Sequence, residues 1–303
     1  MILKSFEELR DKVAACEKKK VVIICAHDGH TLEAALKASE EGILDYVLVG
    51  KKDDILRIGK DLGYTISPED IIHAETDDEA TRKGIALIRE GKADFIQKGL
   101  MQTSTILKGV LDKEHGIRGE GSISHTAILD IPGYHKLVGL TDGGMMTYPD
   151  LNQKKDIIEN AVKVFRGFGY EKPKVAVLAA VEVENPKMKE TVDGAELKRM
   201  NQAGIIKDCI VEGPISVDLA TRIESAKIKK YESPVAGDAD ILVAPDIAAG
   251  NLMSKALYVL GGARMAGIVV GAKCPIALIS RSASYEEKYY SLLCCSYMTE
   301  RNI

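Results

Sequence analysis

The 303-residue sequence contains no tryptophan, and aromatic residues make up only 5% of it. Acidic residues (45) outnumber lysine and arginine (41), so the formal net charge is −4 at pH 7. A nucleic-acid-binding surface needs a basic stripe or aromatic side chains on which bases can stack. Because the sequence offers neither, we expect no nucleic-acid partner.

Long apolar runs are absent as well. The longest is roughly seven residues, whereas a membrane-spanning helix needs about 20. The first ten residues mix acidic, basic and apolar side chains, a pattern typical of an amphipathic helix and unlike a signal peptide. The sequence therefore predicts a cytoplasmic protein that does not associate with membranes.

The six cysteines include no Cys-x-x-Cys pair, and most lie within apolar segments. We expect them to be small buried side chains in a reducing compartment, without zinc. His27 and His30 follow the first apolar run and invite comparison with a metal-binding pair, but a polar loop is the favoured interpretation. No metal site is predicted.

What the sequence does contain is a regular alternation of apolar strands and charged helical segments. Such alternation is typical of an α/β fold with mostly parallel sheets. Helices are expected at residues 32–41, 79–90 and 153–167. Strands are expected at residues 21–26, 46–50, 71–74, 94–97, 137–141, 174–181, 209–212, 240–244, 267–271 and 275–279.

The segment from residue 237 to 255 carries the strongest local signal. Residues 241–244 form an apolar run without alternation, which predicts a buried parallel strand. Pro245 and Asp246 follow, then a turn of small residues ending at Asn251, then a helix from residue 252. A helix N-terminus after a strand collects anions, and Lys255 would lie one turn into that helix.

A second pair of candidate residues, Ser280 and Arg281, follows the expected strand at 275–279. The planar guanidinium of arginine suits bidentate binding of a phosphate oxygen pair. A serine hydroxyl can donate a hydrogen bond to an oxygen that gains charge in a transition state. The alternative is a solvated arginine in an ordinary turn.

Together with their surroundings, these segments resemble the phosphate acetyl/butyryltransferase family. The resemblance rests on residues 211–218, the turn from Asp246 to Asn251 with Lys255, residues 267–273, and the Ser280–Arg281 pair. Residues 98–99 and 121–127 fit the butyryltransferase branch better than the acetyl branch.

The resemblance implies two α/β domains with mostly parallel sheets and a cleft between them, as in isocitrate and isopropylmalate dehydrogenases. The first domain would comprise residues 1–140 and 268–303, and the second residues 141–267. The implied activity is reversible transfer of a butyryl or short branched acyl group from coenzyme A to inorganic phosphate, through direct transfer in a ternary complex. Coenzyme A would be a substrate, no prosthetic cofactor or metal would be needed, and the protein would be a homodimer.

The resemblance also assigns site residues. Ser280, Arg281 and Glu287 would be catalytic, with Glu287 deprotonating the thiol of coenzyme A. However, Ser284 and Glu287 also fit a helix capping box, so base and cap stay open for Glu287. The residues expected to bind substrate are Lys98, Gly99, Thr103, Ser122, Ser124, Asp246, Asn251, Lys255 and Lys273.

Some residues depart from this pattern or allow a different one. Lys108 stands where many acetyl-branch relatives have arginine, which argues against acetyl specificity and leaves Arg118 as another anion contact. Asp142 and Asp246 could instead suggest a magnesium site. The rival functions are therefore a phosphate acetyltransferase, a metal- and NAD(P)-dependent dehydrogenase of related fold, and a non-catalytic coenzyme A-binding protein.

Overall fold

A computed structural model describes residues 2–300 of the protein. Its contacts group these residues into two compact units. We call residues 7–120 and 266–300 the terminal unit, and residues 2–6 and 121–265 the central unit. The domain boundary at residue 141 stays a prediction, and Met1 and residues 301–303 of the predicted first domain lie outside the described residues. By contacts alone, the strands at residues 124–141 group with the central unit.

The terminal unit is built on six strands in the order β3–β2–β1–β4–β11–β10. All neighbours in this order run parallel except β10 and β11, which are antiparallel. The middle strand β1 is buried because its last four residues are all aliphatic. The strands are β1 (Lys19–Ile24), β2 (Leu44–Gly50), β3 (Ile71–His73), β4 (Phe95–Lys98), β10 (Arg264–Val270, beginning in the central unit) and β11 (Ile276–Ala277).

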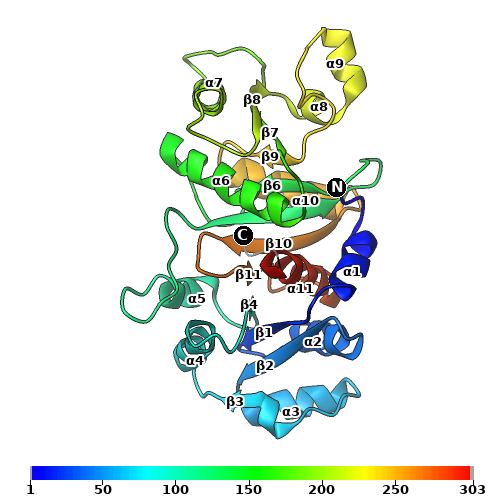
Figure 1. Ribbon diagram of the computed structural model, residues 1–303, viewed down its shortest axis with the longest axis vertical. Coiled ribbons are helices and arrows are strands. Elements are labelled where there is room, and N and C mark those ends of the chain that lie inside the picture. Colours follow the sequence, from blue (N-terminus) through cyan, green and yellow to red (C-terminus); the bar gives the residue numbers. More distant parts are fainter. Residues whose placement is uncertain (1, 301–303) are drawn as a thin grey trace. The chain divides into compact units, whose positions relative to one another are not determined.

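Helices cover both faces of these strands. On one face α11 packs on α2 and β11, and on the other α4 packs on α5, β1 and β2, as the ribbon shows (Figure 1). Caps fix where the helices begin: the side chains of Asp28 and Thr76 accept hydrogen bonds from backbone N–H groups in the first turns of α2 and α4. The helices are α1 (Phe6–Ala14), α2 (Gly29–Glu40), α3 (Lys52–Asp61), η1 (Pro68–Asp70), α4 (Asp77–Arg89), α5 (Thr103–Val110) and α11 (Tyr285–Glu300).

The central unit has five strands in the order β5–β6–β9–β7–β8. Only the β5–β6 pair is antiparallel. The strands are β5 (Ser124–Asp130), β6 (Val138–Thr141), β7 (Lys174–Leu178), β8 (Ile210–Ile215) and β9 (Ile241–Val243). The helices are α6 (Leu151–Gly167), α7 (Lys189–Gln202), α8 (Val217–Thr221), α9 (Ile223–Lys229) and α10 (Ile247–Val259).

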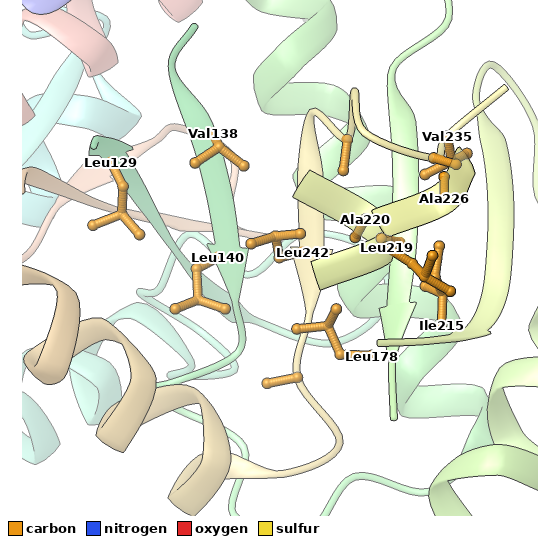
Figure 2. Packing of buried hydrophobic residues seen from close by; sticks show 14 of the residues in the cluster. Leu129, Val138, Leu140, Leu178, Ile215, Leu219, Ala220, Ala226, Val235 and Leu242 are labelled. Carbon is orange, nitrogen blue, oxygen red and sulfur yellow. The ribbon is translucent and has the colours of Figure 1, made fainter. Parts of the chain in front are cut away.

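One hydrophobic core of the central unit joins its strands to α8 and α9 (Figure 2). Leu129, Leu140 and Leu242 contribute from β5, β6 and β9, while Leu219 and Ala226 contribute from the two short helices. Met253 and Leu257 of α10 pack against the same cluster while remaining partly exposed. Helices as short as α8 and α9 depend on this apolar packing for their stability.

The α/β fold with mostly parallel strands is confirmed. All ten predicted strands overlap observed ones, but β5 was missed because its first residues resemble a turn of glycine and serine. The prediction that strand 209–212 ends at Glu212 was wrong: β8 continues through Gly213 and Pro214 to Ile215. Within the described chain, every helix falls short of the length and apolar character that crossing a membrane requires.

Candidate active site

The carboxyl ends of three adjacent parallel strands, β1, β4 and β11, lie at one edge of the terminal unit. Ile24 of β1 pairs with Lys98 of β4, and Ala277 of β11 pairs with Gln97. Lys98 therefore ends its strand beside the segment that leads to Ser280. Ligands of open α/β sheets bind at such strand ends, so this edge is the candidate site.

Lys98 is a buried cation, with only 6% of its surface exposed. Its Nζ donates hydrogen bonds to the carbonyl oxygens of Gly99 at 3.2 Å and Met101 at 2.9 Å. Burial lowers the pKa of the ammonium from 10.5 to about 8, and the positive charges of Lys288 and Arg281 act in the same direction. No carboxylate within residues 2–300 forms an ion pair with it.

Lys288 of α11 lies close by and was missed by the sequence analysis. Its Nζ forms an ion pair with Asp28 and donates to Thr31 Oγ1 at 2.9 Å. Burial acts to raise the pKa of Asp28, but hydrogen bonds from Lys288 and Thr31 outweigh it and lower the pKa. The helical spacing of Lys288, Ser291 and Cys295 was the available signal, because it places the lysine on the buried face of α11.

Ser280 and Arg281 follow β11 in an exposed turn. Ser280 Oγ lies 2.9 Å from Ser282 Oγ and accepts a hydrogen bond from the backbone N–H of Ser282 at 3.3 Å. Arg281 makes no ion pair with the residues that the structure describes, so its guanidinium is available to an anion from solution. Ser282 is a further hydroxyl beside this pair that the sequence analysis did not consider.

Glu287 adopts the geometry of a capping box. Its Oε2 accepts from the backbone N–H of Ser284 at 2.9 Å, and its own N–H donates to Ser284 Oγ at 3.3 Å. The side chain is buried, with 4% of its surface exposed. The structure thus has the cap in place; the general-base role stays a prediction.

The other predicted residues of the terminal unit take up different positions. Gly99 lies so close to the β1 end that an added Cβ would be 2.1 Å from the Cys25 carbonyl oxygen, which explains the glycine. Thr103 is the first residue of α5 and is half-buried. Lys273 is exposed, and its backbone N–H donates to the Ile117 carbonyl.

In the central unit, the expected small-residue turn after β9 is wrong. Residues 247–251 form the first turns of α10, and Asp246 caps it by accepting from the Ala249 N–H at 2.9 Å. Lys255 is consequently about two turns into the helix rather than one. Asn251 Nδ2 donates to the Gly143 carbonyl oxygen at 3.1 Å. The cap carboxylate already occupies the N–H group that an anion would use.

Ser122 and Ser124 are both engaged by α6. Ser122 Oγ donates to Asp156 Oδ2 at 2.7 Å, and Asn160 Nδ2 donates to Ser124 Oγ at 2.9 Å. Ser124 is completely buried. These contacts anchor the start of β5 to α6, and a substrate-binding role for either serine stays a prediction.

A cavity of about 390 Å³ lies between α4 and α5. Its lining includes Lys108, Arg82, Arg89 and Ile85. Lys108 of α5, the residue at which the sequence departs from acetyl-branch relatives, thus lines a cavity between α4 and α5.

Neither cysteines nor acids supply an evident reactive centre. Burial raises the pKa of Cys25 and Cys274 to about 12, so their thiols stay protonated. Asp142, considered as a magnesium ligand, accepts hydrogen bonds from the N–H groups of His125, Gly144 and Met145. Among residues 2–300, no group of three or more His, Cys, Asp or Glu is arranged to hold a metal ion.

Cations gathered at the ends of adjacent parallel strands define an α/β protein that handles anionic ligands. Residues 68–295 match the family described as phosphate acetyl/butaryl transferase, and the chain belongs to that family. The phosphate butyryltransferase of Clostridium acetobutylicum is 41% identical over 96% of this chain and 97% of its own. The phosphate acetyltransferase of Thermotoga maritima is 39% identical over 95% of this chain and 97% of its own.

A solved structure shares the fold over nearly the whole chain. It is a branched-chain phosphotransacylase from Enterococcus faecalis, with a TM-score of 0.81 and 32% identity, covering 93% of this chain and 99% of that one. The three names differ in the acyl group, so similarity establishes the family and leaves the acyl chain open.

Proposed function

We propose that the protein transfers a butyryl or short branched acyl group reversibly between coenzyme A and inorganic phosphate. The observation that carries this proposal, beside family membership, is the placement of Lys98 next to the segment bearing Ser280 and Arg281. Phosphate, acyl phosphate and the phosphates of coenzyme A are all anions. A site of unpaired cations at a strand edge is suited to bind them.

In the proposed reaction, Arg281 binds phosphate oxygens and Ser280 donates to the thioester oxygen as it becomes negative in the tetrahedral state. Holding phosphate and acyl-CoA together makes the attack effectively unimolecular. The raised pKa values of the buried thiols are consistent with direct transfer and give no support to a cysteine-bound acyl intermediate. Lys98, Gly99, Thr103 and Lys273 are retained as proposed substrate contacts, with no resident cofactor.

The test measures release of coenzyme A from butyryl-CoA and acetyl-CoA through a thiol reagent, with and without phosphate and without added metal. Phosphate-dependent release that favours butyryl-CoA supports the proposal. Release that favours acetyl-CoA corrects the acyl chain only. No release from either, together with reduction of a nicotinamide cofactor once metal is added, would replace it with the dehydrogenase alternative.

We further propose that the protein acts as a homodimer and that α10 forms part of the interface. Leu252, Val259 and Leu260 are exposed by 69%, 68% and 85%, and only Gly250 of this helix is buried. Exposed apolar side chains on a helix and at its C-cap are typical of a protein–protein contact.

A further inference from the structure

Four lysines are buried among residues 2–300, and three of them have a carboxylate partner. Lys136 pairs with Asp240, Lys154 pairs with Asp193, and Lys288 pairs with Asp28. Lys98 is the exception. A buried charge normally requires a partner because leaving water is costly. The absence of a carboxylate partner for Lys98 therefore requires an explanation.

The hydrogen bonds of Lys98 suggest that reason. Its Nζ donates to two carbonyl oxygens, those of Gly99 and Met101. A neutral amine has two N–H groups and one lone pair, whereas an ammonium has a third N–H in place of the lone pair. Two fixed acceptors thus hold the nitrogen in either state, and the remaining position is free to gain or give a proton.

The charges around Lys98 keep both states accessible. Burial, Lys288 from α11 and Arg281 from the turn after β11 disfavour the ammonium, whereas the carboxylate of Asp28 before α2 favours it. Asp28 is itself bound to Lys288 and Thr31, so its charge is shared with these groups and forms no ion pair with Lys98. Glu287, the other candidate for proton transfer, accepts a capping hydrogen bond from the backbone N–H of Ser284.

We propose that Lys98 is the general acid that protonates the thiolate of coenzyme A as it leaves, and the general base for the thiol in the reverse direction. This proposal rests on the proposed function. In the forward reaction a phosphate oxygen forms a bond to the thioester carbon, and the carbon–sulfur bond breaks. The sulfur takes a proton from Lys98, and Lys98 regains one from the phosphate that has been acylated. One proton thus passes from hydrogen phosphate to the thiol, and no electrons are gained or lost.

The acidity of Lys98 suits this task. A pKa of about 8 lies close to that of an unperturbed thiol at about 8.5, so transfer in either direction is nearly balanced. An ordinary lysine, with a pKa near 10.5, would give up its proton less readily.

The test compares Lys98→Arg and Lys98→Ala with the wild-type protein, using Lys113→Ala as the control. Lys113 is exposed and lies outside the candidate site. Arginine keeps the charge but does not release its proton. We expect Lys98→Arg to lower kcat for phosphate-dependent CoA release about 10²- to 10⁴-fold. Small primary amines should restore Lys98→Ala, at rates that depend on the pKa of the amine.

Four results decide between the proposal and its alternatives. Retention of wild-type kcat in Lys98→Arg shows that only charge is needed and overturns the proposal. Rescue of Lys98→Ala by guanidinium as well as by amines does the same. If Lys98→Ala does not fold, the arginine variant and the wild-type pH profile decide, since forward kcat should fall as the pH rises past about 8. Absence of phosphate-dependent release in the wild type refutes the proposed function instead.

Discussion

Replacing Lys98 with methionine should make the ligand-free protein more stable, although the same change abolishes the proposed proton transfer. The lowering of its pKa from 10.5 to about 8 corresponds to roughly 3 kcal/mol, at about 1.36 kcal/mol per pKa unit. Methionine removes this cost. It also removes hydrogen bonds to the Gly99 and Met101 carbonyl oxygens, each contributing about 1 kcal/mol. The expected net gain is about 1 kcal/mol.

The matched variant is Lys288→Met, which should change stability in the opposite direction. It leaves Asp28 without its partner in a largely buried position. Breaking a buried ion pair from one side costs about 3 kcal/mol or more. Lys98 and Lys288 are both buried lysines at the same edge, so the two variants isolate the effect of pairing.

Urea unfolding at pH 7 in a buffer free of phosphate provides the measurement. The folded protein holds the Lys98 proton less tightly than the unfolded chain does. The destabilisation of the folded protein by the Lys98 charge is therefore complete below about pH 8 and decreases as the pH rises towards 10.5. The advantage of Lys98→Met should shrink over that range. If both variants lower the free energy of unfolding by similar amounts, the view of Lys98 as an unpaired, strained cation is refuted.

Three further outcomes are expected. Asp246→Ala should lower the free energy of unfolding by about 1 kcal/mol by removing the α10 cap, whereas Asp246→Asn should not; a loss of substrate affinity in the asparagine variant would indicate a binding role instead. Gly99→Ala should lower the free energy of unfolding by about 2 kcal/mol or more, because its Cβ would be 2.1 Å from the Cys25 carbonyl oxygen. Gly29→Ala is the control: it has open space around it and should leave the free energy of unfolding nearly unchanged in the same urea experiment. Leu260→Lys should give a monomer by light scattering if α10 is a dimer contact; an unchanged mass would exclude this face.

Local features of the chain were predictable because their causes are local. Each predicted strand overlaps an observed one, because short β-branched and aliphatic runs bounded by turn residues favour buried strands of a sheet. The capping box of Ser284 and Glu287, one of the two roles left open for Glu287, is present because its two hydrogen bonds join residues three apart. The resemblance to a known family similarly depended on motifs read along the chain.

The start of α10 was not predictable from local propensity. Glycine and alanine after Asp246 are compatible with a turn or with a helix. Tertiary packing decides, because Gly250 lies against the backbone of Asp142 and Gly143, where a Cβ would be 2.8 Å from the Asp142 carbonyl oxygen. Strand β5 was missed for the same reason, because its formation depends on pairing with β6 and not on local propensity alone.

The sequence by itself determined the alternation of strands and helices, the capping box of Ser284 and Glu287, and the family. Only the tertiary structure decided that Asp28 pairs with Lys288 and that both charges act on Lys98, because this depends on β1 and β4 being neighbours and on α11 returning to pack beside α2. The lowered pKa of Lys98 follows from its burial and from these neighbouring charges. A pKa depends on desolvation and on charges brought close by the fold, and neither is encoded in the order of neighbouring residues.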